Sequence, residues 1–77
     1  MPDAYGMPTA SDVVAHLNRR LAIRGVTRRV DAIALLPYVN PMWLSNWELP
    51  DLDAWEDRQI LEEELREARW LFPHVME

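Results

Sequence analysis

The chain has 77 residues, no cysteine and a net charge of −5. This length sets one small domain as the upper limit, and the lack of cysteine excludes disulfides and thiolate metal sites as a means of stabilising it. No stretch approaches the roughly 18 apolar residues of a membrane span, so we expect no membrane segment. The two histidines lie far apart in sequence, so neither a metal nor a cofactor is expected.

The charge is distributed unevenly along the chain. Residues 1–40 carry five arginines and three acids, a net charge of +2, whereas residues 41–77 carry three arginines and ten acids, a net charge of −7. The first residues have neither the basic nor the apolar region of a signal peptide. Together with the absence of cysteine, this predicts the cytoplasm of the producing cell, or of a host cell if the gene is viral.

A flexible tail is expected at residues 1–8, followed by a single helical domain at residues 9–77. The first helix has a clear beginning, because Thr9 or Ser11 can cap its N-terminus. It has an equally clear end at Gly25, since glycine readily adopts the left-handed conformation that terminates helices.

Two further helices are predicted in the middle of the chain. Apolar residues at helical spacing indicate a second helix from Arg28 to Leu36, which Pro37 would end. Asn40 followed by Pro41 is typical of an N-cap and first helical residue, so a short, tryptophan-rich third helix is expected over residues 41–48.

The fourth predicted helix is long and acidic and covers residues 54–72. Asp53 is its expected cap, and Pro73 stops it. At 100° per residue, its core-facing stripe contains Ala54, Leu61, Leu65, Ala68 and Phe72. The predicted fold is therefore all-α: a small compact bundle of about four helices, of which two are medium, one is short and one is long.

The four tryptophans divide into two pairs. Trp43 and Trp47 lie four residues apart in the predicted third helix, where large aromatic side chains would form the centre of the core. The alternative is that one side of this helix stays open for a partner. Trp55 and Trp70 project away from the core stripe of the fourth helix. Either Trp55 folds over a helix corner and Trp70 stacks on Arg66, or both anchor a partner. The candidate partner-binding residues are Trp55, Trp70, Arg66, Glu62 and Glu63.

An alternative interpretation rests on a cluster of arginines around Gly25. Two helices meeting at this glycine would form a unit like a helix-turn-helix, with nucleic acid bound by Arg19, Arg20, Arg24, Arg28 and Arg29. Bulky Leu21 near the turn, Asp31 in the would-be recognition helix and the negative net charge all oppose this interpretation. Nucleic acid is therefore the less favoured partner.

The expected function is non-catalytic protein binding, as a regulator, inhibitor or accessory subunit of a larger protein machine. Three features would indicate an enzyme, and the sequence shows none of them: a nucleophile with a neighbouring base, a glycine-rich phosphate loop, or a distinctive carboxylate pair. The acidic half favours a partner with a basic surface. Because a core this small is marginal, either a homodimer or a stable complex with another protein is expected. By analogy, phages and other mobile elements often encode short regulators of this composition.

Overall fold

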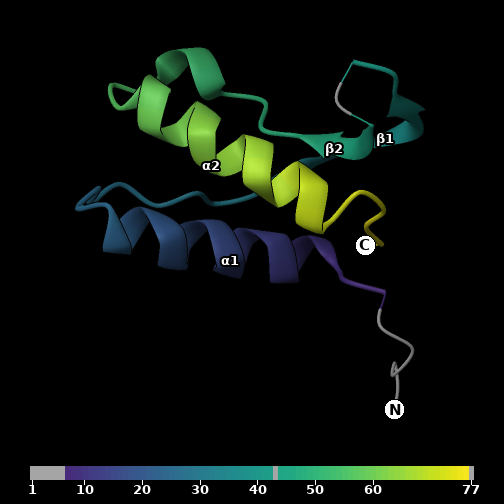
Figure 1. Ribbon diagram of the computed structural model, residues 1–77, viewed down its shortest axis with the longest axis horizontal. Coiled ribbons are helices and arrows are strands. Elements are labelled where there is room, and N and C mark those ends of the chain that lie inside the picture. The colour runs from purple at the N-terminus through teal and green to yellow at the C-terminus, as the bar shows by residue number, and fades with distance from the viewer. Residues whose placement is uncertain (1–6, 43, 77) are drawn as a thin grey trace.

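The computed structural model describes residues 7–42 and 44–76 and shows a mixed α/β fold. The elements in chain order are helix α1 (Ala10–Ile23), strand β1 (Ala34–Asn40), strand β2 (Ser45–Glu48), a 3-10 turn η1 (Leu52–Ala54) and helix α2 (Arg58–Leu71). The two helices run antiparallel, and the β1–β2 hairpin lies beside the C-terminal half of α2 (Figure 1). The predicted all-α four-helix bundle is therefore wrong.

Helix α1 begins and ends where the sequence predicts. Thr9 and Asp12 form a complete capping box: Thr9 N–H donates to Asp12 Oδ2 at 2.9 Å, and Asp12 N–H donates to Thr9 Oγ1 at 3.3 Å. At the other end Gly25 has a φ of 81°, and Val26 N–H reaches back to Leu21 O at 2.9 Å. This is the Schellman arrangement, in which a left-handed glycine allows the next amide to bond the last turn.

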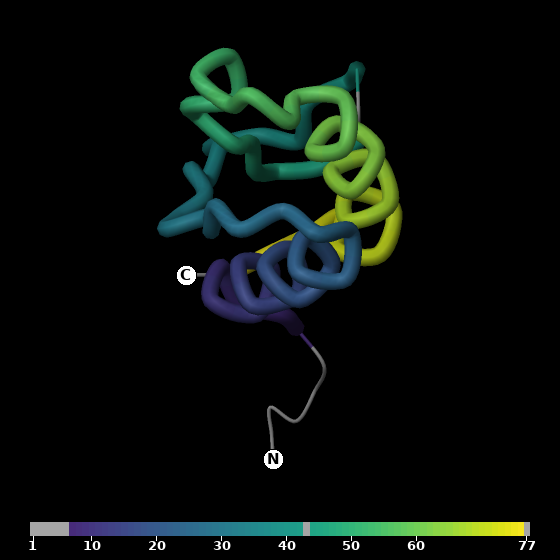
Figure 2. Tube along the Cα trace, turned by 90° about the vertical axis from the view of Figure 1, so that its left-hand side faces the viewer, coloured from purple at the N-terminus to yellow at the C-terminus, as the bar shows by residue number. Residues whose placement is uncertain are grey.

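The predicted second helix is wrong, because residues 26–33 run extended before β1 begins (Figure 2). The buried Asn18 side chain on α1 holds this segment: Val30 N–H donates to Asn18 Oδ1 at 2.7 Å, and Asn18 Nδ2 donates to Val30 O at 3.0 Å. These bonds replace those that a helix would supply to Val30. Pro37 lies within β1 rather than ending an element; the strand pairs with β2 alone among the described elements, and an edge strand tolerates proline.

The predicted third helix is also wrong, since β1 and β2 pair as a β-hairpin and residues 41, 42 and 44 lie in the turn between them. Asn40 Oδ1 accepts the N–H of Met42 at 2.8 Å, and Asn40 O accepts the N–H of Leu44 at 2.7 Å. Leu44 takes a φ of 56°, which turns the chain into β2. An Asn-Pro pair can cap a helix or close a turn, because in both cases the asparagine oxygen accepts an amide two residues on.

Helix α2 starts later than predicted but ends as expected. The chain first makes the short turn η1 and an extended residue at Trp55, so the helix begins at Arg58 instead of residue 54. Leu71 is its last residue, two positions before Pro73, which confirms the predicted stop. Asp53, the expected cap, lies inside η1.

The C-terminal segment connects β2 to the start of α1. Asn46 Nδ2 donates to Val75 O, and Val75 N–H donates to Asn46 Oδ1, both at 2.9 Å. Met76 then pairs with the first described residues, through Met76 N–H to Pro8 O at 2.9 Å and Ala10 N–H to Met76 O at 2.8 Å. Most of the tail predicted at residues 1–8 lies outside the described residues, but Pro8 is held by this bond.

One continuous core fills the space between α1, α2 and the hairpin. Its fully buried residues are Val13, Leu17 and Leu21 from α1, Trp47 from β2, and Leu61, Leu65 and Ala68 from α2. The predicted stripe of the last helix is thus confirmed at these three α2 positions and wrong for Ala54, which is exposed. Within the described ranges, neither helix is long and apolar enough to cross a bilayer.

Candidate protein-binding face

A groove of about 800 Å³ lies between α2, the hairpin tip and η1. Two of its residues, Met42 and Leu44, come from the loop that joins β1 to β2, and Leu52 comes from η1. The remaining lining residues belong to α2 and the segment that follows it: Glu62, Arg66, Arg69, Trp70 and Pro73. The groove is therefore built from parts of the chain that the fold brings together.

The most exposed large apolar side chains of the described residues border this groove. Trp70 is 81% exposed, Met42 79% and Leu44 67%. Scattered single apolar residues are normal on a protein surface, but a cluster around a hollow is typical of an interaction site. Tryptophan in particular combines a large apolar area with few rotatable bonds, which makes it an effective anchor. We therefore take the groove as the candidate binding face.

Two arginines and one glutamate form the polar part of the groove. Glu62 Oε2 accepts a bond from Arg58 Nε at 3.3 Å, so an arginine outside the groove already balances its charge. Burial lowers the pKa of the Arg69 guanidinium, while the nearby Glu48 and Glu62 oppose that shift. Arg66 is exposed, and no carboxylate of the described residues lies within ion-pair distance of it. The groove consequently offers Arg66 as a cation for an incoming carboxylate.

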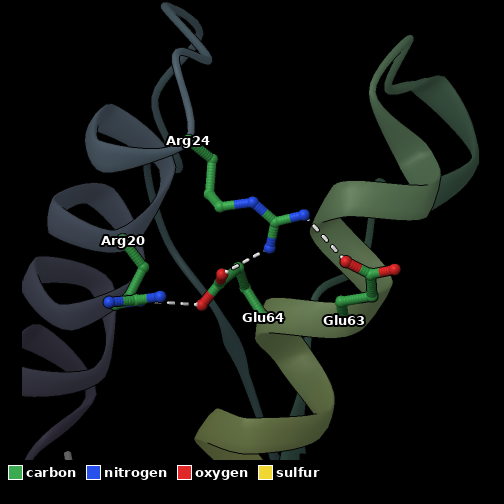
Figure 3. A network of polar contacts seen from close by, with 4 residues as sticks. All are labelled: Arg20, Arg24, Glu63 and Glu64. Carbon is green, nitrogen blue, oxygen red and sulfur yellow. Dashed lines mark hydrogen bonds and ion pairs between the residues drawn. The ribbon is translucent and has the colours of Figure 1, made fainter.

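On the other side of Trp70, an ion-pair network joins the two helices (Figure 3). Arg20 Nε lies 3.1 Å from Glu64 Oε1, and Arg24 Nη1 lies 2.8 Å from Glu64 Oε2. Arg24 also contacts Glu63 Oε1 through Nη2 at 2.8 Å. The Glu64 side chain is only 3% exposed, and both of its oxygens are bonded. The network therefore supplies the partners that a buried carboxylate requires.

The pKa of Glu64 reflects two opposing effects. Burial raises the pKa of its carboxyl, but the hydrogen bonds from Arg20 and Arg24 outweigh that effect, so the pKa lies below its ordinary value of 4.5. The bond to Glu64 raises the pKa of Arg20, and the bonds to Glu63 and Glu64 raise the pKa of Arg24. In the folded protein Glu64 therefore keeps its charge to a lower pH than an ordinary glutamate does.

This network predicts a specific loss of stability in acid. In the unfolded chain Glu64 takes up a proton near pH 4.5, whereas in the folded protein it resists protonation, so the free energy of unfolding falls as the pH drops from 4.5 through the folded pKa. Glu64→Gln removes this titration and is expected to show a shallower acid dependence than the wild type. Denaturant unfolding across a pH series measures both slopes, and equal slopes would contradict the assignment.

The structure separates the predicted partner-binding residues into two groups. Glu62, Arg66 and Trp70 border the groove together, and Glu63 lies beside them in the hollow that contains the ion-pair network. Trp55 is 5% exposed and belongs to the core, because it precedes α2 instead of lying on its outer face. Of the two tryptophans predicted as core, Trp47 is fully buried, and Trp43 lies outside the described residues.

Trp55 is covered by an arginine from the extended segment. The Arg28 guanidinium carbon lies 4.2 Å from the centre of the Trp55 ring, and the indole Nε1 donates to Asp51 Oδ1 at 3.4 Å. Arg28 also donates to Ala54 O at 3.0 Å and pairs with Asp51 at 3.3 Å. This local cluster fixes the turn before α2.

Most of the predicted nucleic-acid-binding arginines are engaged within the protein. Arg20, Arg24 and Arg28 all pair with acids, as described above, whereas Arg19 and Arg29 are exposed. The helix-turn-helix interpretation also needs a helix at residues 28–36, where the chain is extended or in β1. No observation on these arginines therefore favours a nucleic-acid site.

The contribution of the hairpin to the groove was not predicted from the sequence. Met42 and Leu44 were expected in a helix at the centre of the core, and only the alternative with one open side of that helix allowed for their exposure. Leu52 was assigned no role. The Asn40–Pro41 pair, if interpreted as a turn, would have indicated that Met42 and Leu44 lie in an exposed loop.

Across the described residues, no group of three His, Cys, Asp or Glu side chains is placed to hold a metal ion.

Comparison of the chain with protein-family models, with curated proteins and with solved structures found no match.

Proposed function

We propose that this chain is a non-catalytic protein-binding module that acts as a regulator, inhibitor or accessory subunit of a larger assembly. The observation that carries the proposal is the exposure of Trp70, Met42 and Leu44 around a single groove. Exposing such side chains to water is unfavourable by about 25 cal/mol for each Å² of apolar surface, and a partner removes that cost. The presence of this exposed apolar surface on so small a domain therefore supports a binding role.

The charges of the groove define the chemistry of the partner further. The sequence as a whole favours a basic partner, but the acids nearest the groove are already balanced: Glu62 by Arg58, and Glu63 by Arg24. Arg66 is the group that a partner can still neutralise. We therefore assign to the groove a protein segment with a large apolar side chain and a neighbouring carboxylate.

We place this function in the cytoplasm of the producing cell, or of a host cell if the gene is viral. The support comes from composition, because small domains in oxidising compartments usually depend on disulfides and this sequence contains no cysteine. The core is instead built from leucine, valine and tryptophan side chains and from buried polar clamps.

Trp70→Ala tests the proposal, with Ile23→Ala as its matched control. Ile23 is 66% exposed at the end of α1 and does not line the groove. Affinity capture from the producing cells, followed by binding isotherms with the captured protein, is expected to show a loss of about 2 kcal/mol or more for Trp70→Ala. Ile23→Ala should bind like the wild type. Both variants should keep a free energy of unfolding within about 1 kcal/mol of the wild type, because both positions are exposed.

A captured protein that binds wild type and Trp70→Ala with equal affinity would contradict the proposed face. If no protein is captured by the wild type and lost by Trp70→Ala, the proposed function itself is contradicted.

A further inference from the structure

The outer side of α2 carries a stripe of four exposed residues: Glu63, Arg66, Glu67 and Trp70. Their spacing of three, four and seven residues places them on one face of the helix. All four line the hollow beside the ion-pair network, and Arg66 and Trp70 also line the groove. The stripe therefore lies at the junction of both concave regions, in the centre of the candidate binding face.

The stripe is complementary to itself in one orientation. When a second α2 is laid antiparallel on the first, about a two-fold axis passing between Arg66 and Glu67, position 66 of each helix faces position 67 of the other. Two Arg–Glu pairs then form, related by symmetry. A parallel arrangement would instead bring Glu63 and Glu67 against their own copies, and like charges at such a distance repel. A two-fold interface requires this reciprocal matching.

The same register places Trp70 of each copy opposite Glu63 of the other. Glu63 already contacts Arg24 at 2.8 Å, so covering its carboxylate does not leave an unpaired charge. The Arg24 guanidinium also gives the aromatic ring a cation to pack against. Glu62, the residue before Glu63, lines the adjacent groove. The exposed indole thus meets a hollow lined mainly by charged side chains, in which Glu63 is already paired with Arg24.

We infer that a second copy of this chain docks on the Glu63–Trp70 stripe of α2, antiparallel, with reciprocal Arg66–Glu67 pairs and with Trp70 of each copy covered against Glu63 of the other, in the hollow beside the ion-pair network. This inference rests on the proposed function, because it names the partner that occupies the same face. A second copy meets the chemistry of this face, since its α2 presents a carboxylate, Glu67, to Arg66 and a large apolar side chain, Trp70, three residues further on. Self-association also supplies burial that a 77-residue core without disulfides lacks.

Charge exchange at the two central positions tests the inference. Arg66→Glu places acids opposite each other at both contacts, and Glu67→Arg places bases opposite each other. Each single variant is therefore expected to dimerise about 100-fold more weakly than the wild type, since like charges in an interface cost several factors of ten in affinity. The double variant Arg66→Glu/Glu67→Arg restores both pairs with their signs reversed and should dimerise again.

Mixing the two single variants gives the sharpest measurement. In a heterodimer of Arg66→Glu with Glu67→Arg, both contacts join one acid and one base, so sedimentation should show a dimer in the mixture although each variant alone is monomeric. A general loss of folding cannot produce this result. Far-UV circular dichroism and melting curves of both variants provide the folding control, and both positions are exposed.

Three results would overturn the inference: a wild type that sediments as a monomer across the concentration series, single variants that dimerise like the wild type, or a mixture that stays monomeric. The capture experiment with Trp70→Ala separates this failure from failure of the proposed function. If the wild type is a monomer but still captures another protein through Trp70, only the docking of a second copy is overturned. If dimerisation responds to the charge exchange as expected but no other protein depends on Trp70, only the regulatory role is overturned.

Discussion

Trp47→Ala is expected to unfold most of the protein at ambient temperature. Trp47 is fully buried on β2, and its Nε1 donates to Phe72 O at 2.8 Å, so the substitution removes both core volume and a hydrogen bond that ties the hairpin to the end of α2. Replacing a buried tryptophan with alanine costs about 3–5 kcal/mol. Cores of this size rarely supply more than about 3–5 kcal/mol in total. Denaturant unfolding followed by circular dichroism measures the loss.

The other tryptophans provide the controls for this result. Trp55→Ala should also destabilise strongly, because Trp55 is 5% exposed and packs under the Arg28 guanidinium. Trp70→Ala should cost about 1 kcal/mol or less, as substitutions on the surface do. Trp47→Phe keeps an aromatic ring but loses the bond to Phe72 O, so it should fall between wild type and Trp47→Ala. Equal losses for Trp47→Ala and Trp70→Ala would contradict the division into core and surface.

The sequence predicts both ends of α1 and the end of α2, but neither the start of α2 nor the middle of the chain. The capping box at Thr9, the glycine at position 25 and the proline at position 73 act through residues within a turn or two, so their effect is the same in any tertiary context. The state of Val30, by contrast, is decided by Asn18, twelve residues away. Valine and isoleucine at the spacing of residues 28–36 suit a helix and an extended segment equally well, and local pattern cannot choose between them.

The part of the candidate site that depends on helical periodicity was predicted, and the part that depends on tertiary contacts was not. The side of α2 on which Trp70, Arg66 and Glu62 lie follows from helical periodicity alone, so their placement together could be worked out without the fold. Trp55 was misplaced because the start of α2 depends on the turn that Arg28 and Asp51 hold. Met42 and Leu44 were missed because the hairpin was interpreted as a helix.

Two asparagines perform equivalent structural roles that composition does not reveal. Asn18 bonds both the N–H and the C=O of Val30, and Asn46 bonds both groups of Val75. A carboxamide has one donor and one acceptor side at the spacing of a peptide group, so each asparagine replaces a neighbouring strand for one residue. Aspartate lacks the donor and leucine lacks both, so neither can substitute in this role.

Asn18→Leu is expected to release the extended segment from α1. Leucine has nearly the same shape, so packing is kept while Val30, 3% exposed, loses partners for two backbone groups. Each buried group left without a partner costs about 1–3 kcal/mol, which makes a total of about 2–6 kcal/mol for the two groups. Denaturant unfolding should show this loss, and hydrogen exchange should show reduced protection of the Val30 amide.

Asn46→Leu distinguishes the two clamps. Asn46 is only half-buried, and it holds the chain near its C-terminal end, so its loss should expose the Val75 amide to exchange and leave Val30 protected. Asn18→Leu should loosen the segment that leads into β1, and with it the hairpin that carries Met42 and Leu44 to the groove. Binding through the groove would then weaken although none of its lining residues has changed. If Asn18→Leu leaves both the stability and the Val30 protection at wild-type values, the extended path of residues 26–33 does not depend on Asn18, and another contact must set it.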